Sequence, residues 1–192
     1  MFRQMLRDEF HHHAELSGHQ LDRLEEHYKL LLRWNQRLNL IRFKDLIELV
    51  RLHYCESLFL ALKLPEGPLR IADVGSGAGF PGIPIAVLRL GSNVSLIERD
   101  QRKAVFLRDS SRQIPNTRVL ALGAEVCNER FDWVVARAVP PKEVLALGLA
   151  PSAALLISDK DAPAEADVVK VPWGEHRVLS VSRGTVPRET PL

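Results

Sequence analysis

The residues best suited to chemistry form a glycine-rich segment of ten residues, Asp73-Val74-Gly75-Ser76-Gly77-Ala78-Gly79-Phe80-Pro81-Gly82. A short apolar run precedes this segment and a helix-compatible run follows it, which predicts a loop between a strand and a helix. Gly75, Gly77 and Gly79 allow the backbone to adopt positive φ and to approach a ligand closely. Such a loop binds nucleotide-like ligands at the start of the helix. Asp73 lies at the end of the strand, where it either reaches a charged group of the ligand or caps the following turn.

A carboxylate follows at Glu98, sixteen residues after Gly82 and directly after the apolar run Val94-Ser95-Leu96-Ile97. A carboxylate at the end of the second strand of such a unit can accept hydrogen bonds from both hydroxyls of a ribose. The glycine loop and Glu98 together therefore predict a site for a cofactor that contains adenosine.

Two further segments carry polar groups to the ends of later strands. Gly123-Ala124-Glu125 follows the third expected strand, where an adenine edge would lie, although Glu125 also fits a solvated loop. Arg137 ends the fourth expected strand and serves either as a ligand contact or as a structural ion-pair partner. Ligands of open α/β sheets bind outside the carboxyl ends of the strands, so all four segments are expected to meet in one crevice.

The glycine loop allows two interpretations of the cofactor. Residues 77–82 satisfy GxGxxG, the dinucleotide pattern, which alone is weak evidence for a nicotinamide oxidoreductase. Pro81 and Pro84 remove backbone N–H donors at the start of the helix, which suits a pyrophosphate poorly. S-adenosylmethionine has no phosphate, so we favour it. An NAD(P)-binding oxidoreductase and a non-catalytic RNA-binding protein of Rossmann-like fold are the alternatives.

The pattern of apolar residues predicts two parts. Residues 1–64 form a helical extension, with amphipathic stripes around residues 21–32 and 46–61, and Pro65-Glu66-Gly67-Pro68 breaks the helix. Residues 69–192 alternate strands and helices, which predicts a mostly parallel seven-stranded α/β sheet with helices on both faces. The connection at 172–175 is too short for a crossover, so the last two strands should form an antiparallel hairpin. Expected strands lie at 70–74, 94–98, 118–122, 133–137, 153–157, 168–171 and 177–181, and expected helices at 83–90, 101–113 and 142–147.

Composition limits the function classes. With 192 residues, 46% hydrophobic content and a formal net charge of +2, the chain suits a folded protein without a strong general attraction to nucleic acid. Two isolated cysteines disfavour a disulfide framework and a zinc site. No apolar run matches a membrane span, and no apolar signal core is present at the N-terminus. We expect a cytoplasmic protein that is a monomer. We also expect no metal site at His11, His12 and His13, because three consecutive side chains on a helix point in different directions.

Several motifs occur in the order found in one family. Asp73–Gly82 followed by Ile83-Pro84 resembles the glycine motif of the guanine-N7 methyltransferases of bacterial 16S ribosomal RNA, the RsmG family, once called glucose-inhibited division protein B. Similar matches lie at 34–40, at 53–58, at Glu98 with 102–107, and at 136–139. The resemblance implies a Rossmann-like S-adenosylmethionine-dependent enzyme with an N-terminal helical part, which acts on small-subunit RNA. It also implies cofactor contacts at Gly75, Phe80, Ala124, Glu125 and Arg137.

The chain departs from this family at three positions. Ile41 replaces the usual Thr, Pro140 replaces a small residue, and Asp161 replaces the expected Gly. None of these positions belongs to the expected cofactor site, so the differences concern the side of the protein that would face RNA.

Three pairs of residues are candidates for contact with RNA. Asn35 and Asn39 share a helix face and either contact RNA or bond to the adjacent loop. His53 and Ser57 are neighbours on a helix and either line the RNA side of the pocket or bond to each other. Arg102 and Lys103 belong to a basic excess over residues 99–118, which either meets phosphate or forms a solvated helix face.

The expected reaction needs no general base. Guanine N7 carries a lone pair and no proton, so it can attack the sulfonium methyl directly and in line with the departing sulfur. Catalysis is then mostly positioning. Arg137 is the candidate anchor, for RNA phosphate, for guanine O6 or for the methionine carboxylate of the cofactor.

Overall fold

Seven apolar runs after residue 69 form the seven strands of one sheet in the computed structural model, which describes residues 1–184. The last eight residues of the predicted 69–192 domain lie outside the described residues. The strand order is β3-β2-β1-β4-β5-β7-β6. The strands are β1 Arg70–Val74, β2 Asn93–Ile97, β3 Thr117–Leu120, β4 Trp133–Arg137, β5 Ser152–Ser158, β6 Asp167–Lys170 and β7 Arg177–Ser182.

Strands β1 to β5 run parallel to one another, and β7 is antiparallel to both β5 and β6. The α/β class, the mostly parallel sheet and the terminal hairpin predicted from the sequence are therefore confirmed. The sequence did not indicate that β7 lies between β5 and β6. Its six-residue register with β5, from Ala153 opposite Ser182 to Ser158 opposite Arg177, fixes that order.

Short helices connect the parallel strands and position the site. They are α5 Gly82–Leu88, α6 Gln101–Ser111 and α7 Pro141–Ala146, each within two residues of the expected bounds at every end. The side chain of Asp100 caps α6 by accepting hydrogen bonds from the amides of Arg102 and Lys103 at 2.9 and 3.2 Å. Single turns of 3-10 helix follow β3, at Ala124–Val126, and β5, at Asp159–Asp161.

Polar side chains cap the starts of two of the N-terminal helices, at Ser17 and at Asp45. The N-terminal helices are α1 Phe2–Phe10, α2 Gly18–Leu38, α3 Leu46–Leu49, a π-helical turn Val50–Cys55, and α4 Glu56–Lys63. Ser17 and Gln20 form a reciprocal capping box at the start of α2. The second amphipathic stripe, at 46–61, is continuous but passes through the π-helical turn rather than forming one regular helix.

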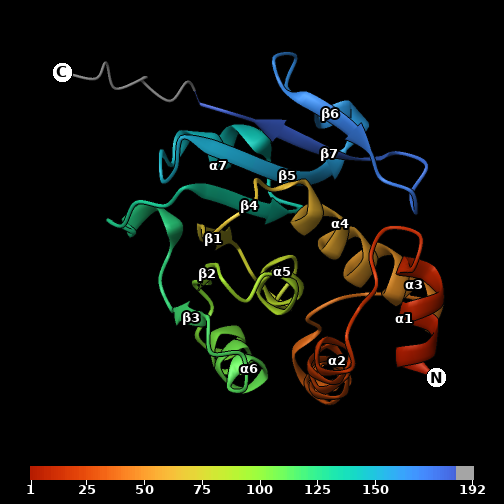
Figure 1. Cartoon of the computed structure of the whole chain (residues 1–192). Coiled ribbons are helices and arrows are strands. Elements are labelled where there is room, and N and C mark those ends of the chain that lie inside the picture. The colour runs from red at the N-terminus through yellow and green to blue at the C-terminus, as the bar shows by residue number, and fades with distance from the viewer. Residues whose placement is uncertain (185–192) are drawn as a thin grey trace.

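Helices α2, α4, α5 and α6 gather on one face of the sheet, and α7 lies on the other (Figure 1). One buried apolar cluster joins the N-terminal helices, α5, α6 and one face of the strands, from Phe2 to Val181. A smaller cluster, which includes Val144 of α7, covers the opposite face. The division into parts 1–64 and 69–192 stays a prediction, since the described residues of both parts share the larger cluster.

Candidate functional site

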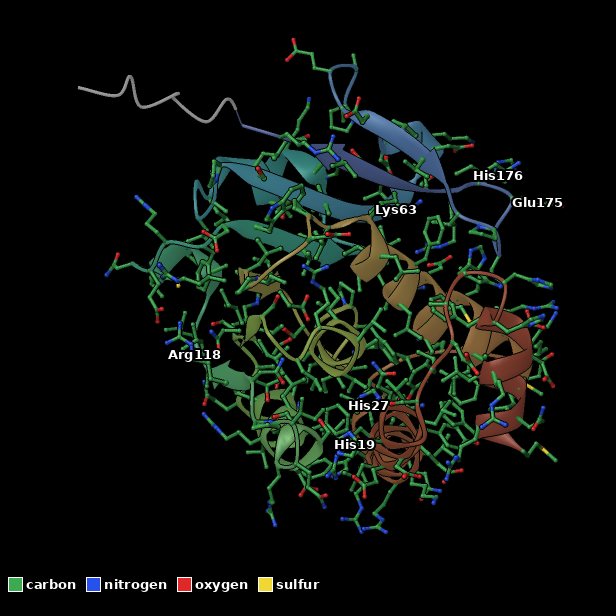
Figure 2. All side chains as sticks on the ribbon, in the orientation of Figure 1. His19, His27, Lys63, Arg118, Glu175 and His176 are labelled. Carbon is green, nitrogen blue, oxygen red and sulfur yellow. The ribbon has the colours of Figure 1, made fainter. Side chains whose placement is uncertain are left out.

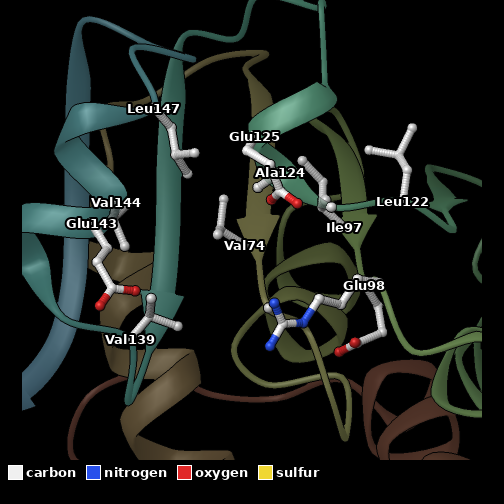
Figure 3. Close-up of a pocket in the computed structure, with 13 residues that line it drawn as sticks. Val74, Ile97, Glu98, Leu122, Ala124, Glu125, Val139, Glu143, Val144 and Leu147 are labelled. Carbon is white, nitrogen blue, oxygen red and sulfur yellow. The ribbon is translucent and has the colours of Figure 1, made fainter.

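A cavity of about 270 Å³ lies at the carboxyl ends of β1 and β2, beside the turn that follows β3 (Figure 3). Gly75, Glu98, Ala124 and Glu125, four of the residues predicted to hold the cofactor, line it. Its remaining walls come from residues that the sequence did not single out as cofactor contacts: Val74, Ile97, Arg99, Leu122, Gly123, Val139, Glu143, Val144 and Leu147. The structure thus brings together groups from three strand ends, as expected for an open α/β sheet.

The glycine loop reaches this cavity with its backbone. Gly75 and Gly77 have φ of +70° and +51°, which favour glycine. The amide of Gly75 donates to the carbonyl of Ile97 at 3.0 Å, so the loop is bonded to the end of β2. Gly79 also has positive φ, at +84°. Only Gly75 of these three glycines lines the cavity, so cofactor contacts of Gly77 and Gly79 stay predictions.

Glu98 links the loop to the start of α6. Its Oε2 accepts from the amide of Gly77 at 2.9 Å and its Oε1 accepts from the amide of Asp100 at 2.8 Å. The side chain is nearly buried, with 7% exposure, yet it forms part of the cavity wall. Its carboxylate is therefore held in one position, and each oxygen keeps a lone pair for a further donor.

Asp73 lies beneath α5 rather than in the cavity wall. Its Oδ2 accepts from the amide of Gly82 at 3.0 Å, which caps the helix, and its Oδ1 is buried without a partner. Burial raises the pKa of this carboxyl to about 7, against the opposing hydrogen bond from Gly82. Of the two roles expected for Asp73, the structure shows the helix cap, and a ligand contact stays a prediction.

Phe80 packs inside an aromatic cluster behind the loop. Its ring meets those of His27, His53 and Tyr54 at centroid distances of 5.2, 5.1 and 5.0 Å. The side chain is buried and does not line the cavity. It supports the loop from behind, and direct contact with a cofactor stays a prediction.

His27 of α2, labelled in Figure 2, connects the N-terminal helices to the glycine loop, and no motif in the sequence indicated this role. Its Nε2 donates to the carbonyl of Ala78 at 2.9 Å, and its Nδ1 accepts from the hydroxyl of Tyr54 at 2.8 Å. Burial lowers the pKa of this fully buried imidazole to about 4, so the ring is neutral at pH 7. A signal was present, because His27 falls between Leu24 and Leu31 on the apolar stripe of α2.

The turn after β3 contributes Ala124 and Glu125 to the cavity. Gly123 precedes them, and the carboxylate of Glu125 lies so close to it that a Cβ at this position would push that side chain aside. Glu143 of α7 adds a carboxylate on the wall opposite Glu98 (Figure 3). With Arg99, the cavity holds three carboxylates and one guanidinium, an arrangement that favours a cationic ligand.

Arg137, at the end of β4, belongs to a buried ion cluster and does not line this cavity. Its Nη1 donates to Glu56 Oε2 at 3.0 Å and also to the carbonyl of Leu52. Glu56 is fully buried and accepts two further hydrogen bonds from Arg177, at 2.6 and 2.7 Å. Burial lowers the pKa of Arg137 to about 10 while Glu56 opposes that change, so the guanidinium stays charged at pH 7. The structure shows the ion-pair role, and contact with cofactor or RNA stays a prediction.

His53 and Ser57 lie next to the ion cluster. The hydroxyl of Ser57 donates to the carbonyl of His53 at 2.6 Å, so the two residues bond through the backbone rather than through the imidazole. Nδ1 of His53 is buried without a partner. Burial, assisted by the charges of Arg137 and Arg177, lowers the pKa of His53 to about 3. The ring is thus neutral at pH 7, and its contact with RNA stays a prediction.

The other candidates for RNA contact are partly or fully exposed and differ in their hydrogen bonds. The side chain of Asn35 forms two hydrogen bonds with the backbone of Ile41 in the adjacent loop. Its Nδ2 donates to the carbonyl of Ile41 at 3.0 Å, and its Oδ1 accepts from the backbone amide of Ile41 at 2.9 Å. Asn39 is exposed and ends α2 in the left-handed conformation. The side chain of Arg102 is exposed, and its Nε lies 3.9 Å from Oδ1 of Asp100. Lys103 is partly exposed.

Two properties of residues 1–184 concern metals and membranes. Within that range, no group of three or more His, Cys, Asp or Glu side chains is arranged to hold a metal ion. None of the helices described there is both long enough and apolar enough to cross a bilayer.

Comparison with known families identifies relatives over most of the chain. The family model described as rRNA small subunit methyltransferase G matches residues 20–152. The chain is 40% identical over 149 residues to ribosomal RNA small subunit methyltransferase G of Halorhodospira halophila, covering 74% of this chain and 70% of that one. It is 42% identical over 123 residues to the protein of the same name from Gluconobacter oxydans, covering 62% of each. For that relative, and for one of Rhodospirillum centenum at 61%, the chain spans less than two thirds of the length.

Solved structures agree on the fold. A SAM-dependent O-methyltransferase from Thermotoga maritima superposes with a TM-score of 0.54 at 13% identity, over 83% of this chain and 73% of that one. The 23S rRNA methyltransferase ErmE superposes with a TM-score of 0.53 at 15% identity, over 68% of each chain. The sheet is thus the Rossmann-like sheet of these methyltransferases, which confirms the predicted fold class.

Proposed function

Because this chain belongs to the rRNA small subunit methyltransferase G family, we propose that it transfers a methyl group from S-adenosylmethionine to N7 of a guanine in 16S ribosomal RNA. One observation carries the proposal beyond family membership. The cavity at the carboxyl ends of the strands combines the backbone of Gly75, the fixed carboxylate of Glu98 and the turn at Gly123-Ala124-Glu125. These are the groups expected to hold an adenosine and its methionine chain.

The residues of the cavity fit this cofactor. Each oxygen of Glu98 already accepts one backbone N–H, which aims its free lone pairs for the two ribose hydroxyls. Val74, Ile97 and Leu122 give the cavity apolar walls suited to an adenine ring. The excess of carboxylates over guanidinium groups suits a ligand that carries a sulfonium and an ammonium group.

The reaction relies on positioning. Bound S-adenosylmethionine supplies an electrophilic methyl group on a positively charged sulfur. Guanine N7 has a lone pair and no proton, so no side chain has to remove a proton during the attack. The chain must bring N7 in line with the methyl group and hold it there, which is worth up to roughly 7–11 kcal/mol of the barrier for good alignment.

The RNA partner is proposed to be the 16S RNA of the small ribosomal subunit. The protein is proposed to bind it in the cytoplasm and as a monomer. Arg102 at the start of α6 is exposed and can meet a phosphate, and Lys103 beside it is partly exposed. The structure gives Asn35 a loop-bonding role, whereas Asn39, His53 and Ser57 stay candidates for the RNA side. N7 lies on the Hoogsteen edge, so an unpaired or extruded guanine is the easier target.

Three measurements test the proposal. Calorimetry should detect binding of S-adenosylhomocysteine and no binding of NAD, and the reverse result would favour an oxidoreductase. Methyl transfer from labelled cofactor to small-subunit RNA should be observed, since its absence would indicate a non-catalytic RNA-binding protein. Mass mapping of 16S RNA from cells that lack the protein should show one guanine without its N7 methyl group.

Arg137 provides a test of how the site is assembled. Replacing it with alanine removes a charge from the buried ion cluster at the end of β4 and leaves Glu56 with Arg177 as its remaining partner. We expect Arg137→Ala to reduce turnover on small-subunit RNA. Full turnover in that variant would show that Arg137 has no essential role for cofactor or RNA.

A further inference from the structure

A second cavity, of about 300 Å³, lies over the carboxyl ends of β4 and β5, next to the proposed cofactor cavity. Val139 lines both cavities, so the two share a wall at that side chain. Its γ-methyl lies against the glycine loop, because a Cβ on Gly75 would lie 3.3 Å from it. A cavity of this volume is within the range of small-molecule sites.

The backbone between the cavities is held in an unusual conformation. Ala138, which turns the chain off the end of β4, has φ of +55°, a region that residues with a Cβ rarely adopt. This turn places Val139 at the shared wall and directs Pro140 and Pro141 into the lining of the second cavity. Strained backbone of this kind occurs most often at functional sites, where the surrounding structure holds it.

The charged groups of the second cavity differ in their availability. Arg177 lines it but is held by Glu56 through two hydrogen bonds, of 2.6 and 2.7 Å. Asp161 also lines it and is exposed, at the end of the 3-10 turn that follows β5. Asp159, two residues earlier, is paired with His176 at 3.2 Å, whereas no partner for the carboxylate of Asp161 occurs within residues 1–184. Asp161 therefore offers an acceptor that is not already used.

We infer that this second cavity binds the methyl-accepting guanine and that Asp161 recognises it by accepting hydrogen bonds from N1–H and the N2 amino group. The inference rests on the proposed function. Guanine presents these two donors on its Watson–Crick edge, and a carboxylate can accept both. N7 lies on the Hoogsteen edge, so binding the donor edge at Asp161 leaves N7 free to face the shared wall and the cofactor.

The charge of Asp161 also suits the reaction. A bond forms between N7 and the methyl carbon, the bond between sulfur and that carbon breaks, and its electron pair stays on sulfur. No proton moves, but the positive charge passes from the sulfur to the purine. A carboxylate at N1–H stabilises a purine that becomes positively charged. The family resemblance gives glycine as the usual residue at position 161, so this recognition would be a property of this chain.

The test compares guanosine with inosine, which keeps N7 and N1–H but lacks the N2 amino group. The substrate is 16S RNA assembled by ligation, with either base at the nucleotide that mass mapping identifies. For the wild-type protein, we expect kcat/KM to fall by about 10-fold to 100-fold on inosine, as for a lost hydrogen bond to a charged group. Asp161→Ala and Asp161→Gly, which remove both acceptor oxygens, should lose a similar factor on guanosine and should then discriminate the two bases by less than about threefold.

Three controls separate the possible failures. The affinity of both Asp161 variants for S-adenosylhomocysteine should match that of the wild type, which shows that the fold and the cofactor cavity are intact. Glu165→Gln, an exposed acid on the same connection, should behave as wild type. Equal guanosine-to-inosine ratios in the wild type and Asp161→Ala would overturn the inference while leaving the proposed function in place. A wild-type protein that neither binds S-adenosylhomocysteine nor methylates RNA would overturn both.

Discussion

Replacing His27 with leucine tests how the N-terminal helices hold the glycine loop. The substitution keeps an apolar side chain of similar size but removes the donor to Ala78 and the acceptor for Tyr54. Both partners stay buried, and each unpaired group costs about 1–3 kcal/mol. We therefore expect the free energy of unfolding to fall by about 2–6 kcal/mol at pH 7.5. The free energy of unfolding of a folded domain is about 5–15 kcal/mol in total, so the variant should still fold.

The pH dependence of the same variant provides a sharper measurement. The folded pKa of His27 is about 4, below its ordinary value of 6.5, so the unfolded chain binds the proton more tightly. The stability from the neutral ring is fully present above pH 6.5 and is lost as the pH falls toward 4. The difference between the two pKa values corresponds to about 3 kcal/mol. The advantage of the wild type over His27→Leu should shrink by that amount between pH 7 and pH 4.

Urea denaturation of both proteins at several pH values measures this difference. Other groups with shifted pKa values, such as His53 and Asp73, are present in both proteins, so their effects cancel in the comparison. His19→Leu is the matched control, because His19 lies on the same helix but is exposed (Figure 2). If the unfolding free energies of the wild type and His27→Leu run parallel from pH 7 to pH 4, the argument from burial is wrong.

Two further substitutions probe the cavity and the ion cluster. Glu98→Ala removes the acceptor of two backbone amides and the proposed ribose contact, and calorimetry should show about 10-fold to 100-fold weaker binding of S-adenosylhomocysteine; a change below twofold would refute the assigned role. Glu56→Gln leaves Arg137 and Arg177 without a buried counter-charge, and urea denaturation should show a loss of about 3–5 kcal/mol. Unchanged stability would show that the two guanidinium groups are compensated in another way.

Local sequence patterns predicted the strands well and indicated several of the residues that line the cavity at the strand ends. Apolar runs and breakers determine where strands begin and end, so the expected bounds of β1 and β4 match the structure at both ends. Parallel strands carry their carboxyl ends to one edge, which is why Gly75, Glu98 and the turn at Gly123 could be expected together.

Contacts between distant parts of the chain could not be predicted in the same way. Glu56 meets Arg137 across 81 positions and Arg177 across 121, and no local spacing encodes such a pairing. The position of Asp73 follows from the alternation of side chains along a strand. Ala72 and Val74 face the smaller apolar cluster, so the side chain of Asp73, between them, points to the opposite face of the sheet, where α5 lies. The cap on α5 could not be predicted, because the sequence does not indicate which face of the sheet α5 covers.

The order β5-β7-β6 has a consequence for synthesis on the ribosome. Strand β6 pairs only with β7 among the described strands, so it has no docking place until residues up to about 182 have left the exit tunnel. The growing chain must carry β6 unpaired while the parallel strands are already able to assemble. A stop codon before β7 would therefore remove β7 from the gene product and leave β6 without its pairing partner. It would also expose the edge of β5 to aggregation.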